Sequence, residues 1–100
     1  MTEMKSDCKI AAILLAAGNS ERLGRPKQLL KFGDEYLINL IIKQIELSVT
    51  DVVVVVLGAY EPEIRKAIKC ERSETEFNSD WIKGIGTSIK YGLELSLIHI

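Results

Sequence analysis

Two short runs of consecutive apolar residues dominate the hydrophobic pattern of the chain. Residues 10–15 read Ile-Ala-Ala-Ile-Leu-Leu, and residues 52–56 are five valines in a row. A strand with one wet face would alternate apolar and polar residues, whereas a continuous apolar run is typical of a strand covered on both faces, as in a parallel sheet. Valine is β-branched and favours strands. We therefore expect buried parallel strands over residues 10–15 and 51–57.

The segment between these runs has the spacing of a helix. Over residues 35–47, apolar side chains recur three and four positions apart, which places them on one helical face. These are Leu37, Leu40, Ile41, Ile45 and Leu47. Strand, helix and strand within this length predict a βαβ unit with a right-handed crossover.

The second half of the chain predicts further α/β elements. Glu61-Pro62-Glu63 is typical of a helix start, since proline fits the first turn and acidic residues favour the positive end of the helix dipole. Residues 73–77 are a candidate third strand. A last helix is expected over residues 87–95, with Ile89, Leu93 and Leu97 facing inward. The final residues, 96–100, are mostly apolar without a stop signal, so we expect them to begin another strand, in a chain that is a fragment or needs a partner.

Composition narrows the class of protein. A length of 100 residues allows one domain, and the formal net charge of −1 argues against nucleic acid or a membrane surface as the main partner. There is no apolar run near the roughly 20 residues that span a bilayer, and the polar start does not resemble a signal peptide, so we expect a cytoplasmic protein. Cys8, Cys70 and His99 have no metal-ligand spacing.

The loop after the first apolar run carries the candidate chemistry. Gly18 permits close backbone approach, Arg22 can fork onto phosphate oxygens, and Lys27 adds a second cation behind the rigid Pro26. Ligands of open α/β sheets bind outside the carboxyl ends of the strands, where this loop begins. The spacing matches neither the Walker A pattern nor the dinucleotide fingerprint. A triphosphate site is the functional interpretation, and a solvated surface loop is the alternative.

Two motifs in order resemble one known family. The run Leu-Ala-Ala-Gly-x-x-x-Arg-Leu-Gly-x-Pro-Lys at residues 15–27 resembles the signature of the MobA-like nucleotidyltransferase superfamily. Its continuation at residues 28–33 looks most like the molybdenum cofactor cytidylyltransferase branch. Residues 78–88 are similar to the family stretch Asn-x-x-Trp-x-x-Gly-x-Gly-x-Ser. The resemblance implies an α/β fold of three layers (α/β/α) with a Rossmann-like, mostly parallel sheet, of which residues 1–100 would form the N-terminal nucleotide-binding half.

The resemblance also implies roles for single residues. The cations that contact the triphosphate would be Arg22 and Lys27. The nucleotide-binding residues would be Leu15, Ala16, Ala17 and Gly18 around the base and ribose, Gly58 and Ala59 beside the base, and Asn78, Gly84 and Ser88 on the opposite wall. Trp81 is interpreted as a core residue before a ligand contact, and Ser88 could equally be an ordinary helical serine.

The implied reaction is transfer of CMP from CTP to a phosphate-bearing, molybdopterin-type acceptor with release of pyrophosphate. Ala16-Ala17-Gly18 favours the cytidylyl branch, because the guanylyl enzymes tend to have Ala-Gly-Gly there. Mg²⁺ is the expected cofactor, but the family's Asp-x-Pro metal ligand is not found in these 100 residues. Three alternatives stay open: a non-catalytic nucleotide-binding module, transfer to methylerythritol phosphate, and guanylyl transfer. Self-association through exposed apolar surface is a further expectation.

Overall fold

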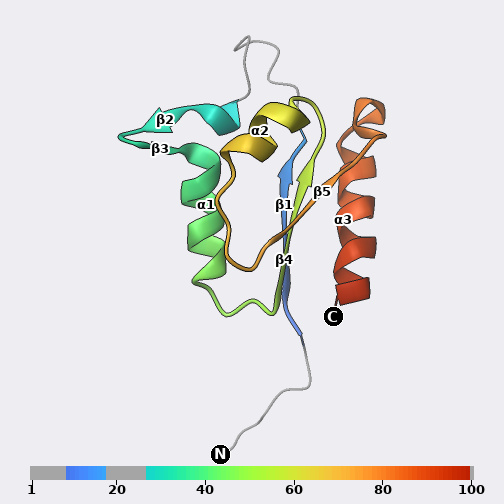
Figure 1. Cartoon of the computed structure of the whole chain (residues 1–100). Helices are drawn as coiled ribbons and strands as arrows, with labels where there is room; N and C mark the ends of the chain where they lie inside the picture. Colours follow the sequence, from blue (N-terminus) through green and yellow to red (C-terminus); the bar gives the residue numbers. More distant parts are fainter. Residues whose placement is uncertain (1–8, 18–26, 100) are drawn as a thin grey trace, which may run out of the picture.

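A parallel sheet lies between two layers of helices in the computed structural model, which describes residues 9–17 and 27–99, without the side chains of Lys27 and His99 (Figure 1). The sheet has the order β1-β4-β5, with both neighbouring pairs parallel. Its strands are β1 (Ala11–Ala16), β4 (Val52–Leu57) and β5 (Glu74–Phe77). Helices α1 (Leu37–Glu46) and α2 (Glu61–Ala67) cover one face, and α3 (Ile85–His99) covers the other. The predicted α/β/α fold class is confirmed.

Strand β4 forms the centre of the core. It pairs with β1 in the register Ala11↔Val52 to Ala16↔Leu57, and with β5 on its other side. From Val53 to Leu57 its side chains are at most 1% exposed. A strand that is paired on both edges and covered on both faces has no position for a polar side chain, which explains the uninterrupted valines.

Helix α1 differs from its prediction at its start and in its buried face. Glu35–Tyr36 is a short strand, β3, which pairs with β2 (Lys31–Phe32) in an antiparallel hairpin ahead of the helix. The fully buried positions of α1 are Ile38, Asn39 and Ile42. The inward face predicted for Leu40, Ile41 and Leu47 is wrong, since they are 37%, 36% and 72% exposed. The apolar residues of α1 were compatible with two overlapping helix faces. The face that is buried in the structure is the one that contains Asn39.

Helix α3 is longer than predicted and faces the sheet with small residues. It continues through Ser96, so the expected strand over residues 96–100 is wrong for the part that the structure describes. The positions buried against β1 and β4 are Ser88, Gly92 and Ser96, each four residues apart. The predicted inward residues Ile89, Leu93 and Leu97 are 42%, 51% and 75% exposed.

Close packing at Gly92 explains this orientation of α3. A Cβ atom at this position would lie 2.6 Å from Ile13 Cγ2 and 3.2 Å from Val56 Cγ2. Only a residue without a side chain allows the helix to lie this near the sheet.

Among residues 9–17 and 27–99, no helix is long and apolar enough to cross a membrane.

Two short 3₁₀ turns complete the described chain. The turn η1 (Lys27–Leu29) precedes the β2–β3 hairpin, and the turn η2 (Trp81–Lys83) joins β5 to α3. Both turns lie in the stretches that carry the two family-like motifs. They therefore connect the candidate site to the scaffold.

Candidate functional site

At the carboxyl ends of the three parallel strands, residues 15–17, the described start of the first motif, lie near the second motif. Beyond β1 and β4, the Ala59 amide donates to the Ala17 carbonyl at 3.4 Å. At β5, the Asn78 amide donates to the Leu57 carbonyl at 2.7 Å. Ala17 thus lies beside Gly58 and Ala59, while Leu15 and Ala16 pair with Val56 and Leu57. Asn78 lies on the other side of β4. This is the edge at which open α/β sheets bind their ligands.

Gly58 is the point of closest approach in this region. A Cβ atom there would lie 2.6 Å from Trp81 Cβ and 2.7 Å from Ala17 Cβ. Both neighbours are atoms attached directly to backbone, so they cannot rotate away. The absence of a side chain at Gly58 therefore lets the segment after β5 close against the end of β1.

Asn78 is the polar centre of the second motif. Its side chain is buried, and its Nδ2 donates to Ser88 Oγ at 2.8 Å and to Thr87 Oγ1 at 3.0 Å. Its Oδ1 accepts from the Asp80 amide at 3.0 Å. The side chain thus joins the end of β5 to the first turns of α3 and uses its hydrogen-bonding capacity within the protein.

Thr87 completes this network and was not identified from the sequence. Its hydroxyl can donate to the carbonyl of Gly84 at 2.8 Å or of Asp80 at 2.9 Å. A hydroxyl directly before Ser88, three residues after a glycine, is the signal that could have revealed it. The result is a braced loop in which the α3 N-terminus has one orientation relative to β5.

The remaining residues of the second motif lie on the surface of this loop. Gly84 is exposed and has φ +118°, a conformation that L residues rarely adopt, so glycine is needed there. Trp81 begins η2 and is only half-buried, although its Cβ packs on Gly58. Trp81 is therefore not a fully buried core residue, but its Cβ atom still packs against Gly58 at the carboxyl end of β4.

The structure describes only part of the predicted phosphate-binding loop. Gly18 and Arg22 lie outside the described residues, and Lys27 begins η1 with its side chain undescribed. Their contacts with a triphosphate remain predictions. Within the described ranges, no group of three His, Cys, Asp or Glu side chains is placed to hold a metal ion.

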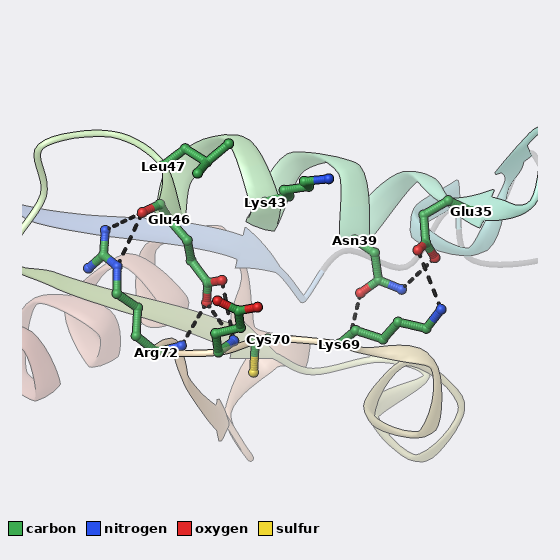
Figure 2. A pocket seen from close by; sticks show the side chains of 9 residues that line it. Glu35, Asn39, Lys43, Glu46, Leu47, Lys69, Cys70 and Arg72 are labelled. Carbon is green, nitrogen blue, oxygen red and sulfur yellow. Dashed lines mark hydrogen bonds and ion pairs between the residues drawn. The ribbon is translucent and has the colours of Figure 1, made fainter.

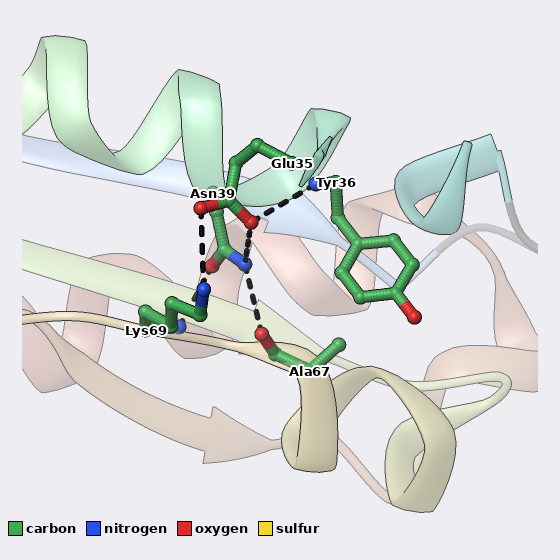
Figure 3. A network of polar contacts seen from close by, with 5 residues as sticks. All are labelled: Glu35, Tyr36, Asn39, Ala67 and Lys69. Atoms are coloured by element: carbon green, nitrogen blue, oxygen red, sulfur yellow. Dashed lines mark hydrogen bonds and ion pairs between the residues drawn. The ribbon is translucent and has the colours of Figure 1, made fainter. Parts of the chain in front are cut away.

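A separate cavity of about 570 Å³ lies between α1 and the segment that leads into β5 (Figure 2). Its polar side chains are largely engaged with one another. Asn39 is buried, donates to the Ala67 carbonyl at 2.8 Å and accepts from the Lys69 amide at 2.7 Å (Figure 3). The Glu35 carboxylate accepts from Asn39 Nδ2 at 3.0 Å and lies 3.4 Å from Lys69 Nζ. The Asn39 amide, followed by the Tyr36 backbone amide, lowers the pKa of Glu35.

Glu46 links the other end of the same cavity. Its carboxylate accepts from the backbone amides of Glu71 and Arg72 and from the Ser73 hydroxyl. Partial burial raises the pKa of Glu46, but these hydrogen bonds outweigh that effect and the net shift is downward. Burial, with the Glu46 charge nearby, raises the pKa of the Cys70 thiol and leaves it protonated at neutral pH. The hydrogen bonds of Asn39 and Glu46 therefore hold α1 against the connection between α2 and β5. We call this region the seam.

The fold is that of an α/β protein, and its candidate ligand-binding edge is the carboxyl end of a parallel sheet. The MobA-like NTP transferase domain family matches residues 12–97, and the chain belongs to this family. A protein of Paenarthrobacter nicotinovorans named nicotine blue oxidoreductase is 33% identical over 84 residues, which cover 83% of this chain and 41% of that protein.

Solved structures show the same similarity. Rv0371c from Mycobacterium tuberculosis H37Rv superposes with a TM-score of 0.66 at 27% identity, over 74% of this chain and 38% of that one. Its homologue from Mycobacterium sp. strain JC1 gives a TM-score of 0.62 at 29% identity, over 70% and 36%. The chain thus spans about two fifths of the length of the proteins it matches.

Proposed function

We propose that this chain is the nucleotide-binding part of a nucleotidyltransferase that transfers CMP from CTP to a phosphate-bearing acceptor of the molybdopterin type. One observation carries the proposal. The two family motifs are about 60 residues apart in the sequence, and the structure places the described part of the first against the second at the carboxyl ends of β1, β4 and β5. Family membership supports nucleotidyl transfer as the reaction class, and the Ala16-Ala17-Gly18 sequence supports cytosine as the base.

The proposed roles follow from position and chemistry. Ala16 and Ala17, with Gly58 and Ala59, would border base and ribose, because they lie at the carboxyl ends of β1 and β4, the edge at which open α/β sheets bind their ligands. Arg22 and Lys27 would neutralise the triphosphate. Since Asn78 and Ser88 already hydrogen-bond to each other, we assign them to positioning the loop that carries Gly84.

The proposed reaction needs no strong base. An acceptor phosphate oxygen, already ionised at neutral pH, attacks the α-phosphorus in line. The new phosphorus–oxygen bond forms as the bond to the β-phosphate oxygen breaks, and pyrophosphate leaves with the electron pair. Positioning and charge neutralisation supply the catalysis in such a transfer. Mg²⁺ remains an expected participant, and no step proposed for this chain's residues depends on it.

Two other functions compete with this one. A nucleotide-binding module without catalysis fits the same geometry. The name of the Paenarthrobacter nicotinovorans relative, an oxidoreductase, makes a redox nucleotide such as a reduced nicotinamide dinucleotide the second ligand class to test.

Nucleotide binding is the first test, and the chain has a built-in probe. Trp81 is its single tryptophan, and it packs on Gly58 beside the proposed base site. Titration with CTP should change its fluorescence, while Arg22→Gln or Lys27→Gln should each weaken binding about 10-fold or more, the loss of one charge-assisted contact. Lys9→Gln is the matched control, because Lys9 precedes β1 at the opposite edge of the sheet. Equal CTP affinity in all three variants would contradict the assigned triphosphate grip.

Turnover then separates the alternatives. Pyrophosphate release is measured with each of the four triphosphates and Mg²⁺, with and without molybdopterin. Release that requires both CTP and molybdopterin supports the proposal. Binding of CTP without release supports a module, and tight binding of a reduced nicotinamide dinucleotide in place of any triphosphate would favour the redox alternative.

A further inference from the structure

The side chain of Trp81 lies directly on the carboxyl ends of the central strands. A Cβ atom built at Gly58 would lie 2.6 Å from Trp81 Cβ and 2.9 Å from Trp81 Cγ, so the indole ring begins over Gly58. The same built atom would lie 2.7 Å from Ala17 Cβ. Trp81 is therefore a neighbour of the residues that the proposed function places beside the nucleotide.

Part of this aromatic side chain is open at the ligand-binding edge. Trp81 is only half-buried, and the other two residues of η2 extend into solvent, since Ile82 is 78% exposed and the Lys83 side chain is 70% exposed. Trp81 is thus the residue of η2 that turns toward the strand ends. Ligands of open α/β sheets bind at these ends, so a ligand there would meet the open part of the indole.

The backbone of Trp81 is fixed on both sides. Its amide donates to the Asn78 carbonyl at 3.2 Å, and its carbonyl accepts from the Gly84 amide at 3.1 Å. The Asn78 side chain is in turn hydrogen-bonded to Ser88 on α3. A side chain whose backbone is already fixed loses less conformational entropy when a ligand binds to it.

We propose that Trp81 stacks on the base of the bound nucleotide and is a binding residue in addition to those assigned above. The proposal rests on the proposed function, which supplies the nucleotide. Removal of an aromatic side chain that stacks on a base typically weakens binding about 5- to 150-fold. Every base has an aromatic face, so Trp81 would contribute affinity for the nucleotide, and the choice of base would depend on other groups.

The test compares CTP with tripolyphosphate, which has the same phosphate chain and no base. Dissociation constants are measured by isothermal titration calorimetry with Mg²⁺, and circular dichroism shows that each variant is folded. Trp81→Leu should raise the constant for CTP about tenfold and leave that for tripolyphosphate within about twofold. Trp81→Phe keeps a ring and should stay within about threefold of wild type for CTP. Tyr91→Leu is the matched control, because it replaces a half-buried aromatic residue in the middle of α3.

A second measurement uses the wild-type chain alone. Saturating CTP should quench the fluorescence of Trp81, and saturating tripolyphosphate should change it much less. An unchanged CTP affinity in Trp81→Leu would overturn stacking while leaving nucleotide binding intact. An equal loss for CTP and tripolyphosphate, or equal fluorescence changes with both, would show that Trp81 only shapes the strand ends and would also overturn it. A wild-type chain that binds neither ligand would overturn the proposed function together with this inference.

Discussion

Replacing Gly92 with alanine tests whether close packing of α3 on the sheet determines the orientation of this helix. Alanine is a better helix former than glycine, so propensity alone predicts a gain of about 1 kcal/mol in stability. The structure predicts a loss, because the new Cβ would lie 2.6 Å from Ile13 Cγ2 and 3.2 Å from Val56 Cγ2. Carbon atoms in contact lie about 3.5–4.0 Å apart, so α3 would have to move away from the sheet.

The size of the effect follows from these opposing contributions. Overpacking a core by one methyl group costs typically 1–3 kcal/mol. Gly86→Ala is the matched control on the same helix, because a Cβ there meets nothing within 4 Å and should add a few tenths to about 1 kcal/mol of stability. Gly92→Ala should therefore be less stable than Gly86→Ala by about 1–3 kcal/mol, which corresponds to a difference of roughly 4–8 °C in Tm per kcal/mol for a domain of this size.

The assay is urea unfolding followed by circular dichroism at one fixed protein concentration, since any self-association shifts apparent stability. A double-mutant cycle identifies the clash: Ile13→Ala removes Cγ2 and should relieve part of the cost of Gly92→Ala, whereas Ile13→Val keeps Cγ2 and should not. If Gly92→Ala is stabilised as much as Gly86→Ala, the close approach does not control the packing of α3, and steric exclusion at Gly92 is refuted as the cause of the helix orientation.

Three further predictions concern the seam and the braced loop. Asn39→Ala should lower the free energy of unfolding by about 1–3 kcal/mol, because the Ala67 carbonyl and the Lys69 amide lose their partner, whereas the exposed Gln44→Ala should be nearly neutral; equal urea midpoints would contradict this role. Gly84→Ala should cost about 1–3 kcal/mol, because alanine is strained at φ +118°, and an unchanged Tm would disprove it. Glu46 has a lowered pKa in the folded state, so its contribution is present above its unfolded pKa of about 4.3 and is lost as pH falls through the folded value. Wild type should therefore exceed Glu46→Gln in urea midpoint at pH 6, and a gap that does not shrink by pH 3 would count against the carboxylate network.

Several parts of the candidate site followed from the sequence, and others could not. The first strand was predictable to within one residue, since residues 10–15 were expected and β1 is Ala11–Ala16. The strand end at Leu57 and the helix start at Glu61 were also predictable, because apolar runs, turn residues and helix-start signals act locally. The bracing of Asn78 by Thr87 and Ser88 was not, because it joins a strand end to a helix ten residues later. The buried Asn39 was missed for the same reason, since its partners lie about 30 residues away.

The sequence by itself determined the layers of this protein and the family to which it belongs. Five consecutive valines indicate a strand covered on both faces, and two spaced motifs indicate a nucleotidyltransferase-like domain before any contact is known. Only the tertiary structure decided which side of each helix packs. In α3, the apolar spacing of Ile89, Leu93 and Leu97 favours them as the inward face, yet Ser88, Gly92 and Ser96 face the sheet. The physical reason is that burial depends on how closely two surfaces can approach, and the missing side chain at Gly92 allows an approach that Ile13 and Val56 would deny to any larger residue.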